Sequence, residues 1–433
     1  MNKQNNPKAI AFLSAHGMYS GQIDLDSTLN DFLGQMTAGL RGEPSSLMMI
    51  PAYIGAASDL AGKSAVVLDA GGTNLRAARI QFDEKGSPVI SDFSKRPMPG
   101  SQTPLTIETF YDALADALQP FASTDEPVGF CFSFPMEILP DREGKILHFV
   151  KEIRVSGASG SKIGAGINAA LRRREVNPKK FVLLNDSVAT LLYGMQDGAA
   201  NTYSGFAGFI LGTGTNVCYM EQGSEITKLG GWQRQMIVNV ESAGYDGFIQ
   251  GTFDRELDAA SQMPGDHILE KMTSGAYQGG LIYRTVRGAV QEGLFTGGFV
   301  DAFDKKPFFT MAEISDYCAN PEGSSRIAQL ALRGTLADRA LLWALIDDSF
   351  ERSAKMTAVV FAAIAAKMRS GRDPAHPLCM SSEGTTFFKA PLFRPKLNAW
   401  LNKWVRDQLG YTIHIIKAEN ATLIGSAVAA LAD

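Results

Sequence analysis

The chain has 433 residues, 45% of them hydrophobic and 20% charged, and its 41 basic and 45 acidic residues leave a formal net charge of −4. This composition excludes a disordered or collagen-like chain, and the lack of a basic surplus argues against a nucleic-acid partner. Because the length is about three times the ~150-residue prior for one domain, we expect two packed domains.

The cysteine and hydropathy patterns exclude further classes of protein. Cys131, Cys218, Cys318 and Cys379 lie far apart and form no C-x-x-C pair, which favours reduced thiols in a cytoplasmic protein. The longest apolar run, residues 356–366, is about half the ~20 residues that span a bilayer, so we expect a buried helix there and no membrane anchor. Residues 9–15 resemble the core of a signal peptide only weakly, and we expect no export.

The first clear element is a strand over residues 64–70, which ends at Gly71-Gly72 and is followed by a second strand over 75–82. The same pattern returns at residues 206–220, where Gly214-Thr215-Asn216 repeats Gly72-Thr73-Asn74 at an offset of 142 residues. This weak internal repeat predicts two similar α/β halves.

Helical and strand-like segments alternate through the rest of the first half. Helices are expected at residues 107–118, 163–174 and 187–193, and strands at 128–134 and 181–184. The last of these strands runs into Asn185-Asp186, directly before a helix. Such alternation predicts mixed or parallel sheets flanked by helices.

The two glycine turns are candidate phosphate-binding sites. Glycines let backbone N–H groups approach an anion closely, and the threonine hydroxyls add donors. Asp69, at the end of the first strand, could hold Mg²⁺ directly or through its waters. Either turn alone is more often an ordinary hairpin, but the matched pair favours phosphate binding.

Four charged residues are candidates for chemistry on a phosphate acceptor. Asp186 lies where a strand ends and a helix begins, so it could take a hydroxyl proton or merely cap the helix. Lys151 could neutralise a phosphoryl group, and Glu241 and Glu270 could bind sugar hydroxyls. Taken singly, each of these three is more often a solvated surface residue.

Several ordered motifs together resemble the hexokinase family of the actin-like ATPases. The segments that carry the resemblance are Met36 to Leu40, Ser45 to Pro51, Leu68-Asp-Ala-Gly-Gly-Thr-Asn-Leu-Arg76, Phe130-Cys-Phe-Ser-Phe-Pro135 with Lys151, Leu184-Asn-Asp-Ser-Val-Ala-Thr190, Leu211 to Glu221, and Pro264-Gly265 through Lys271. Ser382-Glu-Gly-Thr385 resembles the adenosine-binding turn, with glutamate where aspartate is usual, and Glu419 to Gly425 is a looser match to the last nucleotide segment.

The resemblance implies a role for each matching residue. Asp186 would be the general base for the 6-hydroxyl of a sugar, with Lys151 near the transferring phosphoryl group. The sugar would be bound by Ser133, Lys151, Asn185, Asp186, Asn216, Glu241 and Glu270. ATP and Mg²⁺ would be bound by Asp69, Gly71, Gly72, Thr73, Asn74, Arg76, Thr213, Gly384, Thr385 and Thr422, with Asp69 as the metal residue.

The resemblance also implies an α/β fold, the two-domain actin-like (ribonuclease H-like) ATPase fold with an interdomain cleft. The small domain would comprise residues 65–187 plus 418–433, and the large domain 1–64 plus 188–417. Three departures bear on the sugar: Val150 replaces a sugar-binding threonine, Ser242 a tryptophan and Met263 an asparagine. A lost hydroxyl contact costs about 0.5–1.5 kcal/mol, which allows altered sugar choice without inactivity.

The implied function is transfer of the γ-phosphoryl group of Mg·ATP to the 6-hydroxyl of a hexose, with glucose the first choice. The implied enzyme is a glycolytic hexokinase, a cytoplasmic monomer or homodimer with no nucleic-acid or membrane partner. Two alternatives remain open. One is a non-catalytic sugar sensor of hexokinase descent, and the other is an actin- or chaperone-like ATPase, which would need the phosphate turns but not the sugar residues.

Overall fold

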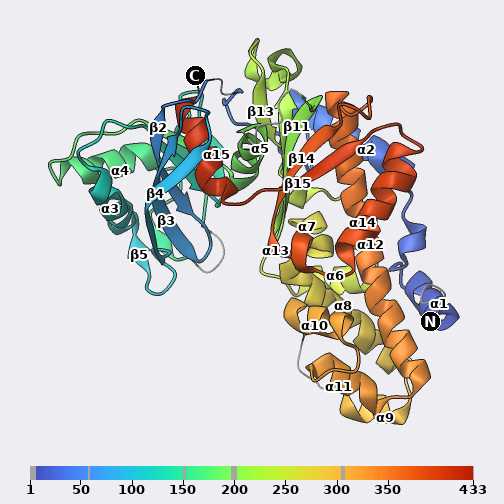
Figure 1. The fold of residues 1–433 in the computed structure, drawn as a ribbon. Helices are drawn as coiled ribbons and strands as arrows, with labels where there is room; N and C mark the ends of the chain where they lie inside the picture. Colours follow the sequence, from blue (N-terminus) through green and yellow to red (C-terminus); the bar gives the residue numbers. More distant parts are fainter. Residues whose placement is uncertain (1–5, 57–58, 150–152, 197–201, 304–307, 433) are drawn as a thin grey trace.

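Two mixed β-sheets form the framework of the protein in a computed structural model, which describes residues 6–56, 59–149, 153–196, 202–303 and 308–432 (Figure 1). The five-stranded sheet has the order β10-β6-β2-β3-β4. Its strands are β2 (Ser64–Ala70), β3 (Asn74–Phe82), β4 (Pro88–Pro97), β6 (Val128–Phe132) and β10 (Phe181–Leu184). The first two of these strands form an antiparallel hairpin, while β6 and β10 continue the sheet in parallel from β2.

The six-stranded sheet has the order β1-β13-β12-β11-β14-β15. Its strands are β1 (Ile50–Pro51), β11 (Gly205–Leu211), β12 (Thr215–Glu221), β13 (Met236–Asn239), β14 (Leu378–Glu383) and β15 (Ile413–Lys417). Here too an antiparallel hairpin, β11–β12, is extended in parallel by two later strands, β14 and β15.

The two sheets therefore repeat one pattern, in which β2, β3, β4, β6 and β10 correspond to β11, β12, β13, β14 and β15. This arrangement is the α/β fold expected from the repeated glycine turns, and it confirms the two similar halves. Two short ribbons lie outside it: β5 (Leu105–Thr106) with β9 (Val155–Ser156), and β7 (Met136–Ile138) with β8 (Gly144–Ile146).

Two helices lie between the sheets. Helix α5 (Asp186–Gln196) packs on β11 and β14, helix α15 (Ala421–Leu431) packs on β2 and β6, and the two helices pack on each other (Figure 1). Their apolar side chains join one buried cluster with both sheets, from Val67 of β2 to Cys218 of β12. The start of α5 consequently lies at a common centre, which is surrounded by the carboxyl ends of β2, β10 and β11.

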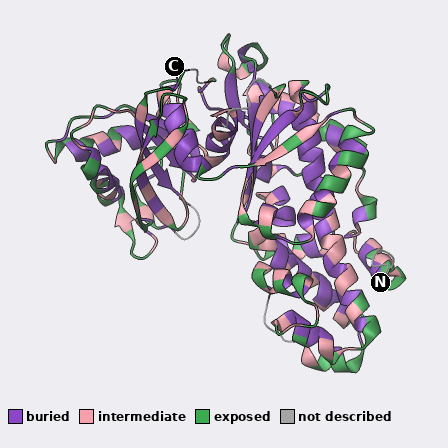
Figure 2. Cartoon of the chain, viewed as in Figure 1, coloured by how far each residue is buried: buried purple, intermediate pink, exposed green. Residues whose placement is uncertain are grey.

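The outer faces of the sheets are covered by other helices. Helices α3 (Ile107–Leu118) and α4 (Ile163–Arg172) form a second core with the outer face of the five-stranded sheet. The remaining helices extend the six-stranded half: α1 (Pro7–Ala15), α2 (Leu25–Arg41), α6 (Thr252–Ala259), α7 (Ile268–Thr273), α8 (Gly275–Gln291), α9 (Gly297–Ala302), α10 (Met311–Ala319), α11 (Arg326–Arg333), α12 (Leu336–Met368), α13 (Thr385–Lys389) and α14 (Phe393–Trp400). Figure 2 shows that the inner strands of both sheets are buried.

The long helix α12 begins at a capping box, in which Thr335 and Asp338 satisfy each other's backbone N–H groups. Residues 356–365 of this helix are all buried, so the longest apolar run is a core helix, as expected. Among the helices of the described residues, none combines the length and the hydropathy of a membrane-spanning segment.

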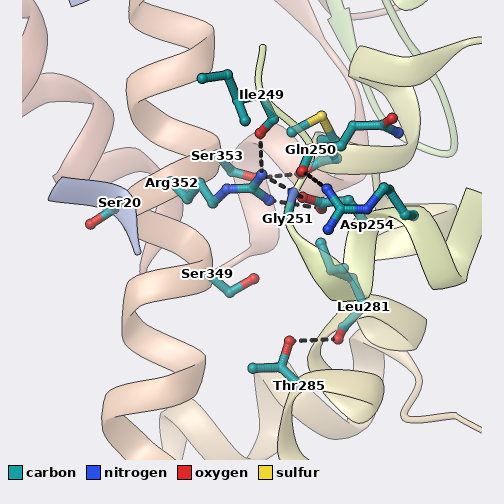
Figure 3. Close-up of polar contacts among 12 residues, drawn as sticks. Ser20, Ile249, Gln250, Gly251, Asp254, Leu281, Thr285, Ser349, Arg352 and Ser353 are labelled. Atoms are coloured by element: carbon teal, nitrogen blue, oxygen red, sulfur yellow. Dashed lines mark hydrogen bonds and ion pairs between the residues drawn. The ribbon is translucent and has the colours of Figure 1, made fainter. Parts of the chain in front are cut away.

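A buried ion pair joins α12 to α6. Nη1 and Nη2 of Arg352 donate to the two carboxylate oxygens of Asp254 at 2.8 and 2.5 Å, and their side chains are only 4% and 1% exposed (Figure 3). Asp254 also accepts a hydrogen bond from the N–H of Gly251, which caps α6. The pair thus fixes the packing of two helices whose residues lie about one hundred positions apart.

Most of the predicted elements are confirmed. The strands 64–70 and 181–184 and the helix 107–118 have the expected bounds. The strand expected at 128–134 ends at Phe132, because the partner strand β2 ends at Ala70, whose carbonyl accepts the last hydrogen bond of this pair from the N–H of Ser133. The helix expected at 163–174 ends at Arg172, before Glu175 adopts a left-handed conformation with a φ of 58°.

Candidate functional site

The second glycine turn lies against the turn after β14. The N–H of Gly212 donates to the carbonyl of Gly214 at 2.9 Å and closes the turn between β11 and β12. Gly384 has a φ of 121°, and a Cβ there would lie 2.2 Å from the carbonyl oxygen of Leu211, so only glycine fits. The exposed residues Thr213 and Thr385 follow these glycines on the two neighbouring turns. The contact leaves backbone N–H groups and two hydroxyls at one edge of the sheet.

The first glycine turn, between β2 and β3, is closed in the same way. The N–H of Gly71 donates to the carbonyl of Asn74 at 3.1 Å, and Thr73 at the tip is exposed. Glycine N–H groups and a threonine hydroxyl are therefore presented at the carboxyl end of β2 as they are at the end of β11. Both turns fit the binding of an anion such as a phosphate.

Asp69 connects the first turn to helix α15. Its Oδ2 accepts a hydrogen bond from Oγ1 of Thr422 at 3.0 Å and forms an ion pair with Arg76, and Arg76 also donates to Thr422 at 3.1 Å. Burial raises the pKa of Asp69, and Arg76 and Thr422 partly offset that effect. Three residues predicted for the nucleotide site thus form one contact network from three elements.

The carboxylates fit a magnesium ion that arrives with phosphates. No group of three or more His, Cys, Asp and Glu side chains could hold a metal by itself within the described part of the chain. Mg²⁺ commonly takes one or two carboxylates together with water and phosphate oxygens. Asp69, at the tip of β2, supplies an oxygen donor of this kind beside the first glycine turn.

A second network joins three asparagines to Glu241. Nδ2 of Asn216 lies 2.8 Å from Oδ1 of Asn239 and 3.4 Å from both Oδ1 of Asn185 and Oε1 of Glu241. Nδ2 of Asn239 donates to Oε1 of Glu241 at 2.6 Å. Burial raises the pKa of Glu241, and the hydrogen bond from Asn239 partly offsets this effect. The network presents amide and carboxylate groups, which are the usual partners of sugar hydroxyls.

Glu270, on α7, connects this network to the second glycine turn. Its Oε2 accepts a hydrogen bond from the N–H of Thr215 at 3.1 Å. A Cβ on Gly214 would lie 2.4 Å from the same oxygen, so glycine is required for the carboxylate to approach the turn. The predicted sugar residues and phosphate residues therefore lie next to each other on the six-stranded sheet.

Asp186 lies at the centre of these groups. It is the first residue of α5, and the N–H of Ser187 lies 2.8 Å from its Oδ1. Its negative charge contributes to the raised pKa values of Asp69, Glu241 and Glu383, so it lies close to carboxylates from both halves. The amino end of a helix also favours a negative charge at this position.

The described residues of the predicted site are brought together. Ser133 lies beside this centre, because its N–H bonds to Ala70 at the end of β2. Lys151 and Val150 lie outside the described residues. Of the other two departures, Ser242 is buried and its N–H donates to Oδ1 of Asn216, whereas Met263 is 42% exposed.

The sequence reasoning missed two residues of the site. Asn239 bridges Asn216 and Glu241, and its position two residues before Glu241 was the available signal. Glu383 stands out in the sequence only as a departure from the usual aspartate, yet it lies close enough to Asp186 and Asp69 that their charges, after burial, raise its pKa. Both become apparent once the strands are assembled into a sheet.

Comparisons with known proteins agree with this geometry. Two family models, both described as hexokinase, match residues 206–432 and 17–195. Mus musculus hexokinase-3 is 27% identical over 413 residues, covering 91% of this chain and 44% of the relative. Schizosaccharomyces pombe hexokinase-1 is 26% identical over 432 residues, covering 92% of this chain and 85% of the relative. The chain thus spans less than half the length of the mammalian relatives.

Solved structures give the same result for the fold. The glucose complex of Schistosoma mansoni hexokinase superposes with a TM-score of 0.78 at 20% identity, covering 98% of each chain. Another hexokinase crystal structure has a TM-score of 0.80 at 18% identity, covering 98% of this chain and 99% of the other. With its two family matches and the hexokinase arrangement of its two sheets, this chain belongs to the hexokinase family.

Proposed function

We propose that this protein transfers the γ-phosphoryl group of Mg·ATP to the 6-hydroxyl of a hexose, and that the hexose is glucose. The observation that carries the proposal is the meeting of two polar networks at Asp186. Asp69, Arg76 and Thr422 form one network, and Asn185, Asn216, Asn239 and Glu241 form the other. Phosphoryl transfer depends mainly on positioning and on charge stabilisation, which such a meeting point supplies.

In the proposed mechanism, Asp186 accepts the proton of the 6-hydroxyl as the oxygen attacks phosphorus. Asn185, Asn216, Glu241 and Glu270, with Ser133, hold the sugar hydroxyls and fix the ring. The glycine turns and Thr73, Thr213 and Thr385 hold the phosphates through N–H and hydroxyl donors. Mg²⁺, when bound with the nucleotide, neutralises charge on the phosphates. By resemblance alone, Lys151 is also proposed to neutralise charge on the transferring phosphoryl group.

We also propose a small domain of residues 65–187 plus 418–433 and a large domain of 1–64 plus 188–417. This division is supported by the packing of α15 on β2 and β6 and of α5 on β11 and β14. Closure of the two domains on the sugar would exclude water, which competes with the sugar hydroxyl as the acceptor.

The test is ADP release from Mg·ATP in the presence of glucose, mannose, fructose, glucosamine or N-acetylglucosamine. We expect release to depend on the sugar and to be fastest with glucose. Sugar-independent ADP release would instead indicate an actin- or chaperone-like ATPase. No release together with a glucose-dependent rise in Tm would indicate a sugar sensor, and Val150→Thr would then be the first reversion to examine.

Replacing Thr422 with valine is expected to weaken the use of Mg·ATP. Valine has the shape of threonine but removes the hydroxyl that bonds Asp69 and Arg76. Leaving such buried polar groups under-bonded costs about 1–3 kcal/mol, so kcat/KM for Mg·ATP should fall by about 5- to 150-fold. The KM for the hexose should change little. Thr422→Ser, which keeps the hydroxyl, is the matched control, and equal losses in both variants would contradict the role of the hydroxyl.

A further inference from the structure

Asn239, the last residue of β13, is a buried amide to which the proposed mechanism assigns no role. Its side chain lies between Asn216 and Glu241, two of the residues proposed to hold the sugar. Oδ1 of Asn239 accepts hydrogen bonds from Nδ2 of Asn216 at 2.8 Å and from the N–H of Glu241 at 3.3 Å. Its Nδ2 donates to Oε1 of Glu241 at 2.6 Å. Because Asn239 is only 5% exposed, these bonds take the place of bonds to water.

Backbone N–H groups determine which way round these amides lie. Oδ1 of Asn216 accepts from the N–H of Val217 at 2.8 Å and from the N–H of Ser242 at 3.3 Å. A backbone N–H can only donate, so the NH₂ group of Asn216 points the other way, toward Asn239. Oδ1 of Asn239 is then the acceptor, and its own NH₂ group is directed at Glu241. The direction of the whole chain of hydrogen bonds therefore follows from the backbone.

This direction leaves complementary groups for a hydroxyl of the sugar. Oε1 of Glu241 is taken by Asn239, whereas Oε2 has no hydrogen-bond partner among the residues that the structure describes. Apart from Asn239, the amide nitrogen of Asn216 has no acceptor closer than 3.4 Å in that part of the chain. A hydroxyl group between them can therefore accept from Asn216 and donate to Glu241.

The same bonds hold the backbone of Glu241 in an unfavourable conformation. Glu241 has a φ of 55°, which lies in the left-handed region that residues other than glycine rarely adopt. Its N–H donates to Asn239, and the N–H of Ser242 donates to Asn216. Backbone strain of this kind persists only where the surrounding contacts fix it. The two asparagines thus set both the backbone and the carboxylate of Glu241.

We infer that Asn239 is a positioning residue, which fixes the hydrogen-bond direction of the sugar site and holds the carboxylate of Glu241 as an acceptor for a sugar hydroxyl. The inference rests on the proposed function and deepens it, because it states which groups of that site donate and which accept. Asn239 acts through its two neighbours and needs no contact with the sugar. Its effect should appear in the affinity for the sugar and should depend on the hydrogen that it donates.

The neutral amide at position 239 suits the charges around Glu241. Burial raises the pKa of Glu241, and the hydrogen bond from Asn239 lowers it, which favours the ionised acceptor. Asp186 of α5 and Glu270 of α7 add negative charge nearby. His267, directly before α7, adds positive charge. Asn239 supplies its hydrogen bond without adding a further charge to these acids.

The first test is Asn239→Asp, with glucose binding measured by isothermal titration calorimetry between pH 5.5 and pH 8.5. A protonated aspartic acid matches asparagine, because its O–H donates to Glu241 and its carbonyl accepts from Asn216. At the 2.6 Å that separates the side chains at positions 239 and 241, two carboxyl groups share one proton. As the pH rises and this proton is lost, the affinity of the variant should fall by about 10- to 150-fold relative to wild type.

Other titrating groups are removed from this comparison. Dividing by the wild-type affinity at each pH cancels the titration of the other acids and of His267. Burial raises the pKa of Cys218, which lies opposite Asn239 on β12, to about 12, so this thiol stays neutral. Asn398→Asp, the same change at an exposed position on α14, is the matched control and should bind glucose as wild type does.

A double variant reverses the direction of the pair. In Asn239→Asp/Glu241→Gln, the new amide donates to the new carboxylate, and its carbonyl oxygen remains as the acceptor for the sugar. In Glu241→Gln alone, the carbonyl faces Asn239 and the NH₂ group faces the sugar, where a donor replaces an acceptor. At pH 8 the double variant should therefore bind glucose about tenfold more tightly than either single variant. It should also lack the pH dependence of Asn239→Asp.

The outcomes separate this inference from the proposed function. Equal pH profiles of wild type and Asn239→Asp would overturn it, and so would a double variant whose loss is the product of the two single losses. The double variant keeps the number of charges and pairs each donor with an acceptor, so it should fold even if Asn239→Asp does not. A double variant whose Tm shows it to be unfolded would also contradict the inferred direction. If folded wild type binds none of glucose, mannose and fructose, the proposed function fails, and this inference fails with it.

Discussion

Replacing Asp186 with asparagine is expected to lower kcat for hexose phosphorylation by about 10²- to 10⁴-fold, which is the usual contribution of a general base. Asparagine keeps the size of the side chain and an oxygen for the N–H of Ser187, but it cannot accept the hydroxyl proton. Sugar affinity should therefore change much less than kcat. Steady-state kinetics with coupled detection of ADP, together with glucose binding by calorimetry, measure the two effects separately.

Asp116→Asn is the matched control for this variant. Asp116 lies on α3, is 56% exposed and pairs with Arg174 at the surface, so the same chemical change there should leave kcat unaltered. If Asp186→Asn keeps more than a tenth of the wild-type kcat, Asp186 is not the base. If it loses glucose binding to the same extent as kcat, its role is to bind the sugar.

Replacing Asp254 with asparagine is expected to lower the free energy of unfolding by about 3–5 kcal/mol. The change leaves the guanidinium of Arg352, which is only 4% exposed, as an uncompensated buried charge (Figure 3). The pair joins α6 to α12, so the loss should appear as a lower urea midpoint for the six-stranded half. Urea unfolding, followed by circular dichroism at 25 °C, measures this loss of stability.

A neighbouring surface pair provides the matched control. Glu256 lies on the same helix α6 and pairs with Arg287, but both side chains are about 40% exposed. Glu256→Gln should therefore cost no more than about 1 kcal/mol. Comparable losses in the two variants would show that burial does not set the strength of the Asp254–Arg352 pair. Replacing both Asp254 and Arg352 by apolar residues should recover part of the stability.

The sequence predicted those parts of the fold that depend on local pattern. The strand 64–70 and the glycine turn after it could be recognised because an apolar, β-branched run and its turn residues lie within a few positions of one another. Helix α12 was predicted only in part, over 356–366. Its first half contains charged residues, such as Arg352, that are typical of a surface helix. Only the distant Asp254 explains why this arginine is buried.

The residues of the candidate site were likewise predictable only where the signal lies in the local sequence. Asp186 and the two glycine turns were predicted because each stands at the end of a strand. Asn239 could not be assigned, since its partners Asn216 and Glu241 meet it only when β12 and β13 pair. Glu383 stands out in the sequence only as a departure from a motif, and its closeness to Asp69 and Asp186 depends on the packing of three separate elements. Such long-range neighbours are determined by the packing of sheets and helices.

A crystal structure with glucose and Mg·AMP-PNP would test the central claim most directly, because the claim is that both networks serve a single transfer reaction. We expect the 6-hydroxyl within hydrogen-bond distance of Asp186, the other hydroxyls on Asn185, Asn216, Glu241 and Glu270, and the phosphates between the two glycine turns. The γ-phosphate should then lie in line with the 6-hydroxyl oxygen. A sugar bound away from Asp186, or a nucleotide that contacts only one of the two turns, would contradict it.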